Sequence, residues 1–503
     1  MPDSDQKTLN ALAKGAGVTA VGMAISKVLT YLYRLSIARY LGPEAYGQLS
    51  LVMMVVGIGS TFAYLALGNG IKKFIPEFRT RGDEARIKGT VLSTLQMAVP
   101  ASIIVWAIIF FGAEWIATTV FENQALIPLI QLMSFSIITG VFTRTFFDTT
   151  IGFNKIIYKT ATVRVLKNVI ELVITVSLLL AGFNVISAIW GSVISSLIAA
   201  ILGFYFLERR VGPIITSDVK PSYNRRQLLR FSSPLLLSGI LATVMGWADT
   251  AILGYYMTDF EVGLYNAALP TAMLILLPHK AIGSLALSSF SELKERDETS
   301  IEESLQTATR WVFSLVFPTF LMMLLFSEQV LTILFGSVYT QASLALSILT
   351  VGYLIDALVG RVGSYLQSEG HTRYLLYNNI AALLLNLILN IMRIPIYGIV
   401  GAAIATASST ILTNLLMFAE VWRKEKIISI PFQKILKIVI TGLIPLLLII
   451  GLDRVLFVNT PYWFLIPAGL IYGLVYIALY ILVLGLGEEE KEVFLRIGEI
   501  TGF

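Results

Sequence analysis

Residues 185–207 read VISAIWGSVISSLIAAILGFYFL, an apolar run of 23 residues without a charged side chain. An α-helix rises about 1.5 Å per residue, so a run of this length crosses the hydrocarbon core of a bilayer. Comparable runs recur along all 503 residues. They predict fourteen spans, near residues 12–38, 45–67, 88–111, 125–149, 160–182, 185–207, 233–256, 262–286, 304–326, 342–366, 375–394, 398–420, 433–451 and 463–485.

The composition agrees with an all-α integral membrane protein and excludes several kinds of chemistry. Hydrophobic residues make up 56% of the chain and charged residues 14%, whereas a soluble domain is about one quarter charged. The absence of cysteine excludes disulfides, thiolate nucleophiles and Cys-ligated metals. The two histidines, His279 and His371, lie far apart, and no Walker A motif occurs. We therefore expect no metal site and no ATP hydrolysis.

The distribution of basic residues predicts the orientation of the spans. Most of the 37 Lys and Arg residues lie in loops that follow even-numbered spans, while the odd-numbered loops contain only Arg39, Arg393 and Arg454. Cytoplasmic loops carry the excess of positive charge. We expect a multi-pass protein of the plasma membrane with both termini in the cytoplasm. The net charge of +5 then reflects these loops, and we expect no nucleic-acid partner.

A basic segment precedes the seventh span. Residues 224–231 read NRRQLLRF, a pattern that predicts a short helix lying on the inner leaflet. Two interpretations stay open. The segment contacts lipid headgroups, or it anchors the orientation and links two halves of the chain.

The chain contains an internal repeat at a long offset. Tyr40–Gly47 (YLGPEAYG) corresponds to Tyr256–Gly263 (YMTDFEVG) with a shift of 216, and Pro76–Arg81 corresponds to Ser291–Arg296 with a shift of 215. The same order relates Arg144 to Arg361, by 217, and Asn168 to Asn386, by 218. These matches predict an N-terminal six-helix bundle at 1–210, a linker at 211–232, a second bundle at 233–422, and a helix pair with a tail at 423–503.

The repeat itself favours a transporter. Six spans is an even number, so both bundles have the same orientation, and their pseudo-two-fold axis runs along the membrane normal. Two such bundles enclose a central cavity, and rocking of one bundle against the other gives alternating access.

Several segments resemble the polysaccharide-exporter family of Wzx-type lipid-linked oligosaccharide flippases, which belongs to the superfamily of multidrug/toxin extruders and lipid II flippases. The segments are Gly15–Gly17, Arg39–Gly47, Ile71–Asp83, Ala248–Thr250, Gly263–Ala268 and Asn386–Thr406. The resemblance implies that the chain moves a glycan linked to polyprenyl phosphate or diphosphate from the cytoplasmic to the outer leaflet. It also implies membrane lipids and other polysaccharide-assembly proteins as partners.

Two other functions are weighed against a flippase. An ion-coupled multidrug exporter of the same superfamily is the alternative, although such exporters usually have twelve spans. A membrane glycosyltransferase would need clustered acidic residues in a sizeable extramembrane region, and the carboxylates here are scattered. We therefore expect no enzyme. Without an ATP site, the energy source is an H⁺ or Na⁺ gradient, the membrane potential, or downstream consumption of the substrate.

Charged residues inside spans are costly and normally face a cavity or a partner. Lys27 and Arg34 lie seven residues apart on one helical face, about 10 Å apart along the axis. We expect them to contact substrate phosphate, since Arg binds phosphate as a bidentate fork and Lys as a point charge. The alternative is an ion pair with Asp249, with Arg34 reaching toward the outer interface. Asp249 and Glu171 are the candidates for charge balance or for a coupling-ion site. The alternative for Asp249 is a structural salt bridge.

The repeat-related arginines Arg144 and Arg361 are predicted to capture phosphate at the inner mouth. The alternative is that each forms a local ion pair, Arg144 with Asp148 and Arg361 with Asp356. A further set of polar residues lies in otherwise apolar spans, where they either line the cavity for sugar hydroxyls or join helices. This set comprises Asn168, Glu171, Asn386 and Asn390, and Lys167 is expected to pair with Glu171.

Overall fold

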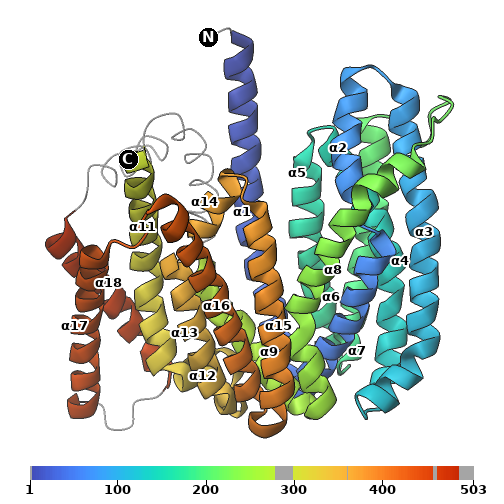
Figure 1. The fold of residues 1–503 in the computed structure, drawn as a ribbon. Helices are drawn as coiled ribbons and strands as arrows, with labels where there is room; N and C mark the ends of the chain where they lie inside the picture. Colours follow the sequence, from blue (N-terminus) through green and yellow to red (C-terminus); the bar gives the residue numbers. More distant parts are fainter. Residues whose placement is uncertain (1–2, 278–297, 360, 457–461, 486–503) are drawn as a thin grey trace. The chain divides into compact units, whose positions relative to one another are not determined.

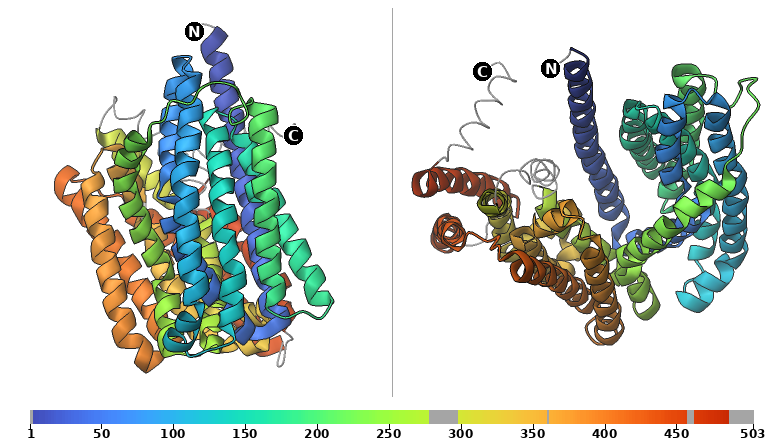
Figure 2. Two further views of the ribbon diagram at one scale, coloured as in Figure 1. Left: turned by 90° about the vertical axis from the view of Figure 1, so that its right-hand side faces the viewer. Right: turned by 45° about the horizontal axis from the view of Figure 1, so that its top comes forward.

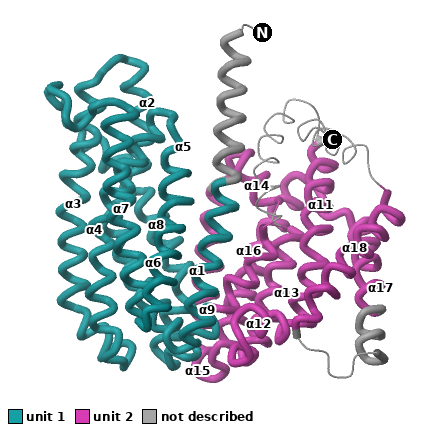
Figure 3. Tube along the Cα trace, turned by 180° about the vertical axis from the view of Figure 1, so that it is seen from behind, with its two compact units in different colours: residues 1–266 teal, residues 267–503 magenta. Residues whose placement is uncertain are grey.

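The computed structural model of the chain describes residues 3–277, 298–359, 361–456 and 462–485, and all regular elements in these ranges are helical (Figure 1). Ten of the described helices are long and apolar enough to cross a membrane. The all-α membrane class is thereby confirmed, while the count of fourteen spans stays a prediction. The chain forms two compact units, residues 1–266 and 267–503 (Figure 3). The lobe boundaries predicted from the repeat also stay a prediction.

Unit 1 begins with α1 (Asp3–Tyr64), which covers the first two predicted spans. The helix is kinked at Gly42, whose φ of 84° and ψ of 178° are non-helical. Glycine adopts positive φ without a steric penalty, and Pro43 directly after it lacks a backbone N–H for the helical ladder. The chain therefore changes direction where the sequence predicts the end of the first span.

A second break follows at the end of α1. Leu65 and Ala66 have φ values of 52° and 54°, a left-handed conformation that costs a non-glycine residue on the order of 1–3 kcal/mol. The chain then continues as α2 (Leu67–Thr80). The surrounding packing must hold this strained pair, and α2 indeed lies against α3, α4 and α8.

The rest of unit 1 is a bundle in which α1 packs against α3, α4, α6 and α8, and α4 packs against α3 and α7 (Figure 2). Glycines permit some of these close approaches, since a Cβ on Gly191 of α7 would lie 2.2 Å from Thr175 Oγ1 of α6. The elements are α3 (Glu84–Trp115), η1 (Ile116–Val120), α4 (Leu126–Gly152), α5 (Ile156–Lys159), η2 (Thr160–Leu166), α6 (Lys167–Leu180), α7 (Ile186–Phe206), η3 (Leu207–Val211), α8 (Arg225–Tyr256) and α9 (Asp259–Ala272).

The two copies of the repeated YLGPEAYG motif contact each other in unit 1. An ideal Cβ on Gly47 would lie 1.8 Å from the carbonyl oxygen of Asp259, and one on Gly263 would lie 1.8 Å from the carbonyl oxygen of Pro43. The shift of 216 relates Gly47 to Gly263 and Pro43 to Asp259. The contact of Gly47 with Asp259 is therefore repeated at equivalent positions by the contact of Gly263 with Pro43. Such an exchange of equivalent contacts is the reciprocal pattern of a two-fold contact. A wider two-fold relation between the halves stays a prediction.

The segment between α7 and α8 is fastened to the bundle. The Glu208 carboxylate accepts hydrogen bonds from the backbone N–H groups of residues 214, 215 and 216 at 3.2, 2.8 and 3.1 Å. Further along, the Ser222 N–H donates to the Ala85 carbonyl at 2.8 Å, and Asn224 donates to Thr90 Oγ1 at 3.0 Å. The basic helix predicted at 224–231 is continuous with α8 and begins from this anchored loop.

Unit 2 is a second helical bundle. Its α16 packs against α13 and α15, α11 packs against α13 and α17, and α17 packs against α18. The elements are η4 (Met273–Leu276), α11 (Glu298–Leu325), α12 (Ser327–Phe335), η5 (Ser337–Ala342), α13 (Ser343–Val359), α14 (Arg361–Ser368), α15 (Thr372–Tyr397), α16 (Ile399–Glu425), α17 (Phe432–Leu456), η6 (Tyr462–Phe464) and α18 (Leu465–Leu484). The repeat segment 291–296 lies outside the described residues.

Candidate functional site

A polar cavity of about 210 Å³ lies inside unit 1, among α1, α4, η2, α6 and α7. Pockets for drug-sized ligands usually measure about 300–1,000 Å³, so this cavity has room for one small group and not for a whole glycan. Its polar walls combine two cations with several hydroxyls. The polar lining residues are Ser60, Tyr64, Ser136, Thr143, Arg144, Lys167, Ser192 and Ser196.

The two cations of the cavity differ in their surroundings. Lys167 Nζ lies 3.1 Å from Glu171 Oε2, which confirms the predicted pair one helical turn apart. Arg144 is exposed to the cavity, with its guanidinium carbon 5.6 Å from the centre of the Tyr64 ring. Within the described part of the chain, Arg144 forms no ion pair. It therefore carries the uncompensated positive charge of this cavity.

Asp148, one turn after Arg144 on α4, has other partners. Its Oδ1 lies 2.7 Å from Lys159 Nζ of α5, and its Oδ2 accepts a hydrogen bond of 3.1 Å from the Tyr64 hydroxyl of α1. The local Arg144–Asp148 pair that the sequence offered as an alternative is therefore not formed. The chain reverses at residues 153–155, where Asn154 has a φ of 60°, and this turn returns Lys159 to the buried carboxylate.

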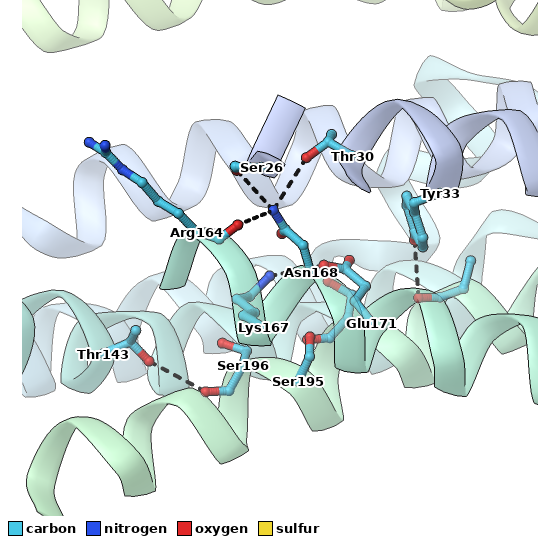
Figure 4. Close-up of polar contacts among 12 residues, drawn as sticks. Ser26, Thr30, Tyr33, Thr143, Arg164, Lys167, Asn168, Glu171, Ser195 and Ser196 are labelled. Atoms are coloured by element: carbon cyan, nitrogen blue, oxygen red, sulfur yellow. Dashed lines mark hydrogen bonds and ion pairs between the residues drawn. The ribbon is translucent and has the colours of Figure 1, made fainter. Parts of the chain in front are cut away.

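Asn168 of α6 points toward the first segment of α1 (Figure 4). Its amide nitrogen donates to Ser26 Oγ at 2.9 Å, to Thr30 Oγ1 at 3.5 Å and to the Arg164 carbonyl at 2.9 Å. These contacts join α6 to α1, as in the helix-joining interpretation. A role of Asn168 in lining the substrate passage stays a prediction.

The predicted phosphate ligands on α1 differ in exposure. Lys27 is exposed, whereas Arg34 is partly buried and hydrogen-bonds the Tyr46 side chain. Asp249 on α8 is 7% exposed, and its Oδ2 accepts a hydrogen bond of 2.5 Å from the Tyr265 hydroxyl. The contacts of Arg34 and Asp249 with tyrosines are interactions that spacing along the chain did not indicate.

Unit 2 contains the repeat-related arginine in a buried position. Arg361 is 2% exposed, and its Nε and Nη1 have no hydrogen-bond partner among the described residues. Asp356, its predicted local partner, accepts a 3.0 Å hydrogen bond from Asn414 of α16. A buried guanidinium with unused donors is costly, so this group is suited to donate hydrogen bonds to the oxygens of an anion.

The polar residues of α15 join neighbouring side chains. Asn386 donates to Thr406 Oγ1 of α16 at 3.4 Å, and Asn390 donates to Asn386 Oδ1 at 3.0 Å. The first of these contacts connects α15 to α16 and the second lies within α15, and a cavity role for the two asparagines stays a prediction. His279 lies outside the described residues. Sequence reasoning did not select Tyr64 and Lys159, because their partner Asp148 is distant from each of them along the chain.

Comparison with known proteins shows the fold and the family. The structure is similar to that of the lipid II flippase MurJ in an inward closed conformation, with a TM-score of 0.74 and 18% identity over 92% of this chain and 98% of that one. It is also similar to an inward-facing multidrug resistance MATE family transporter, with a TM-score of 0.65 and 16% identity over 81% of this chain and 98% of that one. At these identities the likeness shows the fold.

Among curated proteins, the chain is 33% identical to the probable low-salt glycan biosynthesis flippase Agl15 of Haloferax volcanii, over 40% of this chain and 43% of that protein. It is 26% identical to a putative O-antigen transporter of Shigella flexneri, over 46% of this chain and 54% of that protein. The matches thus span about half the length of these relatives. These two relatives are themselves named as a flippase and a transporter.

The family model described as "Polysaccharide biosynthesis protein" matches residues 36–344. This range contains α1 from Ser36 onward, all of the cavity in unit 1, and the helices up to the start of α13. With more than half of its length matched and the fold of flippases and exporters, the chain belongs to the polysaccharide biosynthesis protein family.

Proposed function

We propose that the chain is a flippase that moves a polyprenyl-phosphate- or diphosphate-linked oligosaccharide from the cytoplasmic to the outer leaflet by alternating access. The translocated glycan serves cell-surface polysaccharide or glycoprotein assembly, together with other proteins of that assembly. The protein acts in the plasma membrane with both termini in the cytoplasm. Its relatives named as a glycan flippase and an O-antigen transporter support this substrate class.

The observation that carries the proposal is a pair of arginines at repeat-related positions, one in each unit. Arg144 is exposed to the unit 1 cavity and Arg361 is buried in unit 2, and neither forms an ion pair with another described residue. A cation in or near a membrane span needs a partner. A phosphate group supplies two acceptor oxygens in the geometry of the guanidinium fork, so the substrate itself completes these sites.

The remaining charged residues take secondary roles in the proposal. Lys27 and Arg34 extend the positive charge along the first helix, so that the phosphate meets cations in succession. Asp249 and Glu171 balance this charge and are the candidate sites for a coupling H⁺ or Na⁺. Asn168, Asn386 and Asn390 add hydrogen-bonding capacity for sugar hydroxyls.

The test is transport in liposomes. Purified protein is reconstituted with a fluorescent polyprenyl-diphosphate disaccharide, and the fraction accessible to a membrane-impermeant quencher is followed over time. We expect faster exchange between leaflets than in protein-free liposomes, with a raised half-saturation for Arg144→Gln and for Arg361→Gln. Arg81→Gln is the matched control, because Arg81 is an exposed arginine paired with Glu77 at 2.8 Å. Exchange no faster than in empty liposomes, from protein that remains folded, would refute the proposal.

An ion-coupled multidrug exporter is the second candidate, and similarity to MATE transporters favours it. That structural match covers 81% of this chain, whereas the match to the lipid II flippase covers 92%. Helices α17 and α18 lie at the thirteenth and fourteenth spans predicted from the sequence, whereas exporters usually have twelve. Efflux of a lipophilic cation from the same liposomes under a proton or sodium gradient, without movement of the glycolipid, would establish this alternative.

A further inference from the structure

Two carboxylates contact residues that line the unit 1 cavity, and each of them is paired with a lysine. Glu171 pairs with Lys167 at 3.1 Å, and Asp148 pairs with Lys159 at 2.7 Å. Arg144 is left without an ion pair among the residues that the structure describes. This arrangement is unexpected, because Asp148 lies four residues after Arg144 on the same helix, the spacing at which Asp and Arg normally attract each other.

The structure shows why Asp148 does not turn toward Arg144. One carboxylate oxygen contacts Lys159 Nζ, and the other accepts from the Tyr64 hydroxyl at 3.1 Å. Gly68 of α2 makes room for this orientation, since an ideal Cβ at that position would lie 2.0 Å from Asp148 Oδ2. Both oxygens of Asp148 are therefore occupied by partners other than Arg144.

Tyr64 also contacts Arg144 directly. The guanidinium lies over its ring at 5.6 Å, a distance at which a cation is attracted to an aromatic face. Such a contact holds the cation while leaving its N–H groups free to donate. One tyrosine thus restrains the carboxylate through its hydroxyl and the arginine through its ring.

We infer that Lys159 is a positioning residue for ligand recognition: by holding Asp148 on Tyr64, it keeps Arg144 available for an anionic phosphate group in the unit 1 cavity. The inference rests on the proposed function for the identity of that ligand. Without Lys159, Asp148 becomes a buried carboxylate without its cation, and Arg144 is the nearest cation on its own helix. The resulting Arg144–Asp148 pair then competes with the substrate.

The expected effect is on affinity. Lys159→Gln raises the half-saturation concentration for the polyprenyl-diphosphate sugar by about two- to ten-fold. The lower value corresponds to the strength of an exposed intrahelical ion pair between Arg144 and Asp148, and the upper value to that of a more buried one. Lys159→Arg keeps the charge and stays near the wild-type value. Adding Asp148→Asn to Lys159→Gln removes the competing carboxylate and restores tight binding.

A merely structural role of the ion pair predicts a different pattern. Loss of one buried partner destabilises the fold, and removal of both partners relieves this destabilisation. Rescue by Asp148→Asn therefore does not by itself distinguish positioning from a structural role. The discriminating measurement is Lys159→Gln in an Arg144→Gln background. Positioning through Arg144 predicts no further change in half-saturation there, whereas general damage adds to the Arg144→Gln effect. An additive effect overturns the inference.

Binding of inorganic pyrophosphate, measured by calorimetry on the detergent-purified protein, separates this inference from the flippase proposal. Arg144- and Lys159-dependent pyrophosphate binding without glycolipid movement supports the inference and refutes the proposed function. Glycolipid movement with a half-saturation unaffected by Lys159→Gln refutes the inference alone. If Lys159→Gln does not fold, Asp148→Asn decides: with the competing carboxylate removed we expect it to bind pyrophosphate at least as tightly as wild type, and weaker binding overturns the inference.

Discussion

Substitution of Gly47 by alanine tests the reciprocal contact between the two repeat motifs. The added Cβ would lie 1.8 Å from the Asp259 carbonyl oxygen and 2.7 Å from its carbon, whereas a close C···O contact is about 3.3 Å. Helix α1 and the start of α9 must therefore separate by about 1.5 Å. Overpacking usually costs about 1–3 kcal/mol, and rigid backbone places this site near the upper end. Improved helix propensity offsets about 1 kcal/mol, so we expect a net loss of about 2 kcal/mol.

The assay is thermal unfolding of detergent-purified protein, with the apparent melting temperature as readout. A loss of this size lowers the melting temperature by about 4–8 °C, at about 2–4 °C per kcal/mol for a unit of this length. Gly112→Ala is the matched control, because a Cβ on Gly112 of α3 meets nothing within 4 Å. That variant should melt at or above the wild-type temperature. A Gly47→Ala melting temperature equal to that of Gly112→Ala would show that the contact is not tight.

Three further predictions concern other parts of unit 1. Asn168→Ala removes the bonds between α6 and α1 and should cost about 0.6 kcal/mol, at most about 1.7; an unchanged melting temperature would contradict this. Glu208→Gln weakens the carboxylate cap on residues 214–216, so limited trypsin digestion should cleave after Arg210 faster than in wild type, and equal rates would argue against the cap. Burial raises the pKa of Asp259, at the start of α9, from its ordinary 3.8. Its stabilising contribution is therefore complete below pH 3.8 and is lost as the pH rises through the raised value. Asp259→Asn should flatten this decline in a melting-temperature profile, and an identical profile would contradict the assignment.

The candidate site could be predicted from the sequence only where its geometry is local. Lys167 and Glu171 lie one helical turn apart, so their pairing follows from the helical period, and the structure contains it. The same rule offered Arg144 and Asp148 as a pair, and there it failed. Lys159, eleven residues after Asp148, reaches the carboxylate because the chain reverses at residues 153–155, and Tyr64 reaches it from a different span.

The sequence by itself determined the all-helical membrane class and the break between the first two spans, and it predicted the candidate transport cations, whose role stays a prediction. Each of these depends on run length, on the backbone preferences of Gly42 and Pro43, or on the high cost of charge in hydrocarbon, which are properties of short segments. Only the tertiary structure decided which carboxylate neutralises which cation. Packing of α1, α2, α4 and α5 brings Tyr64, Gly68, Asp148 and Lys159 together, and such contacts depend on helix positions in space that no spacing along the chain encodes.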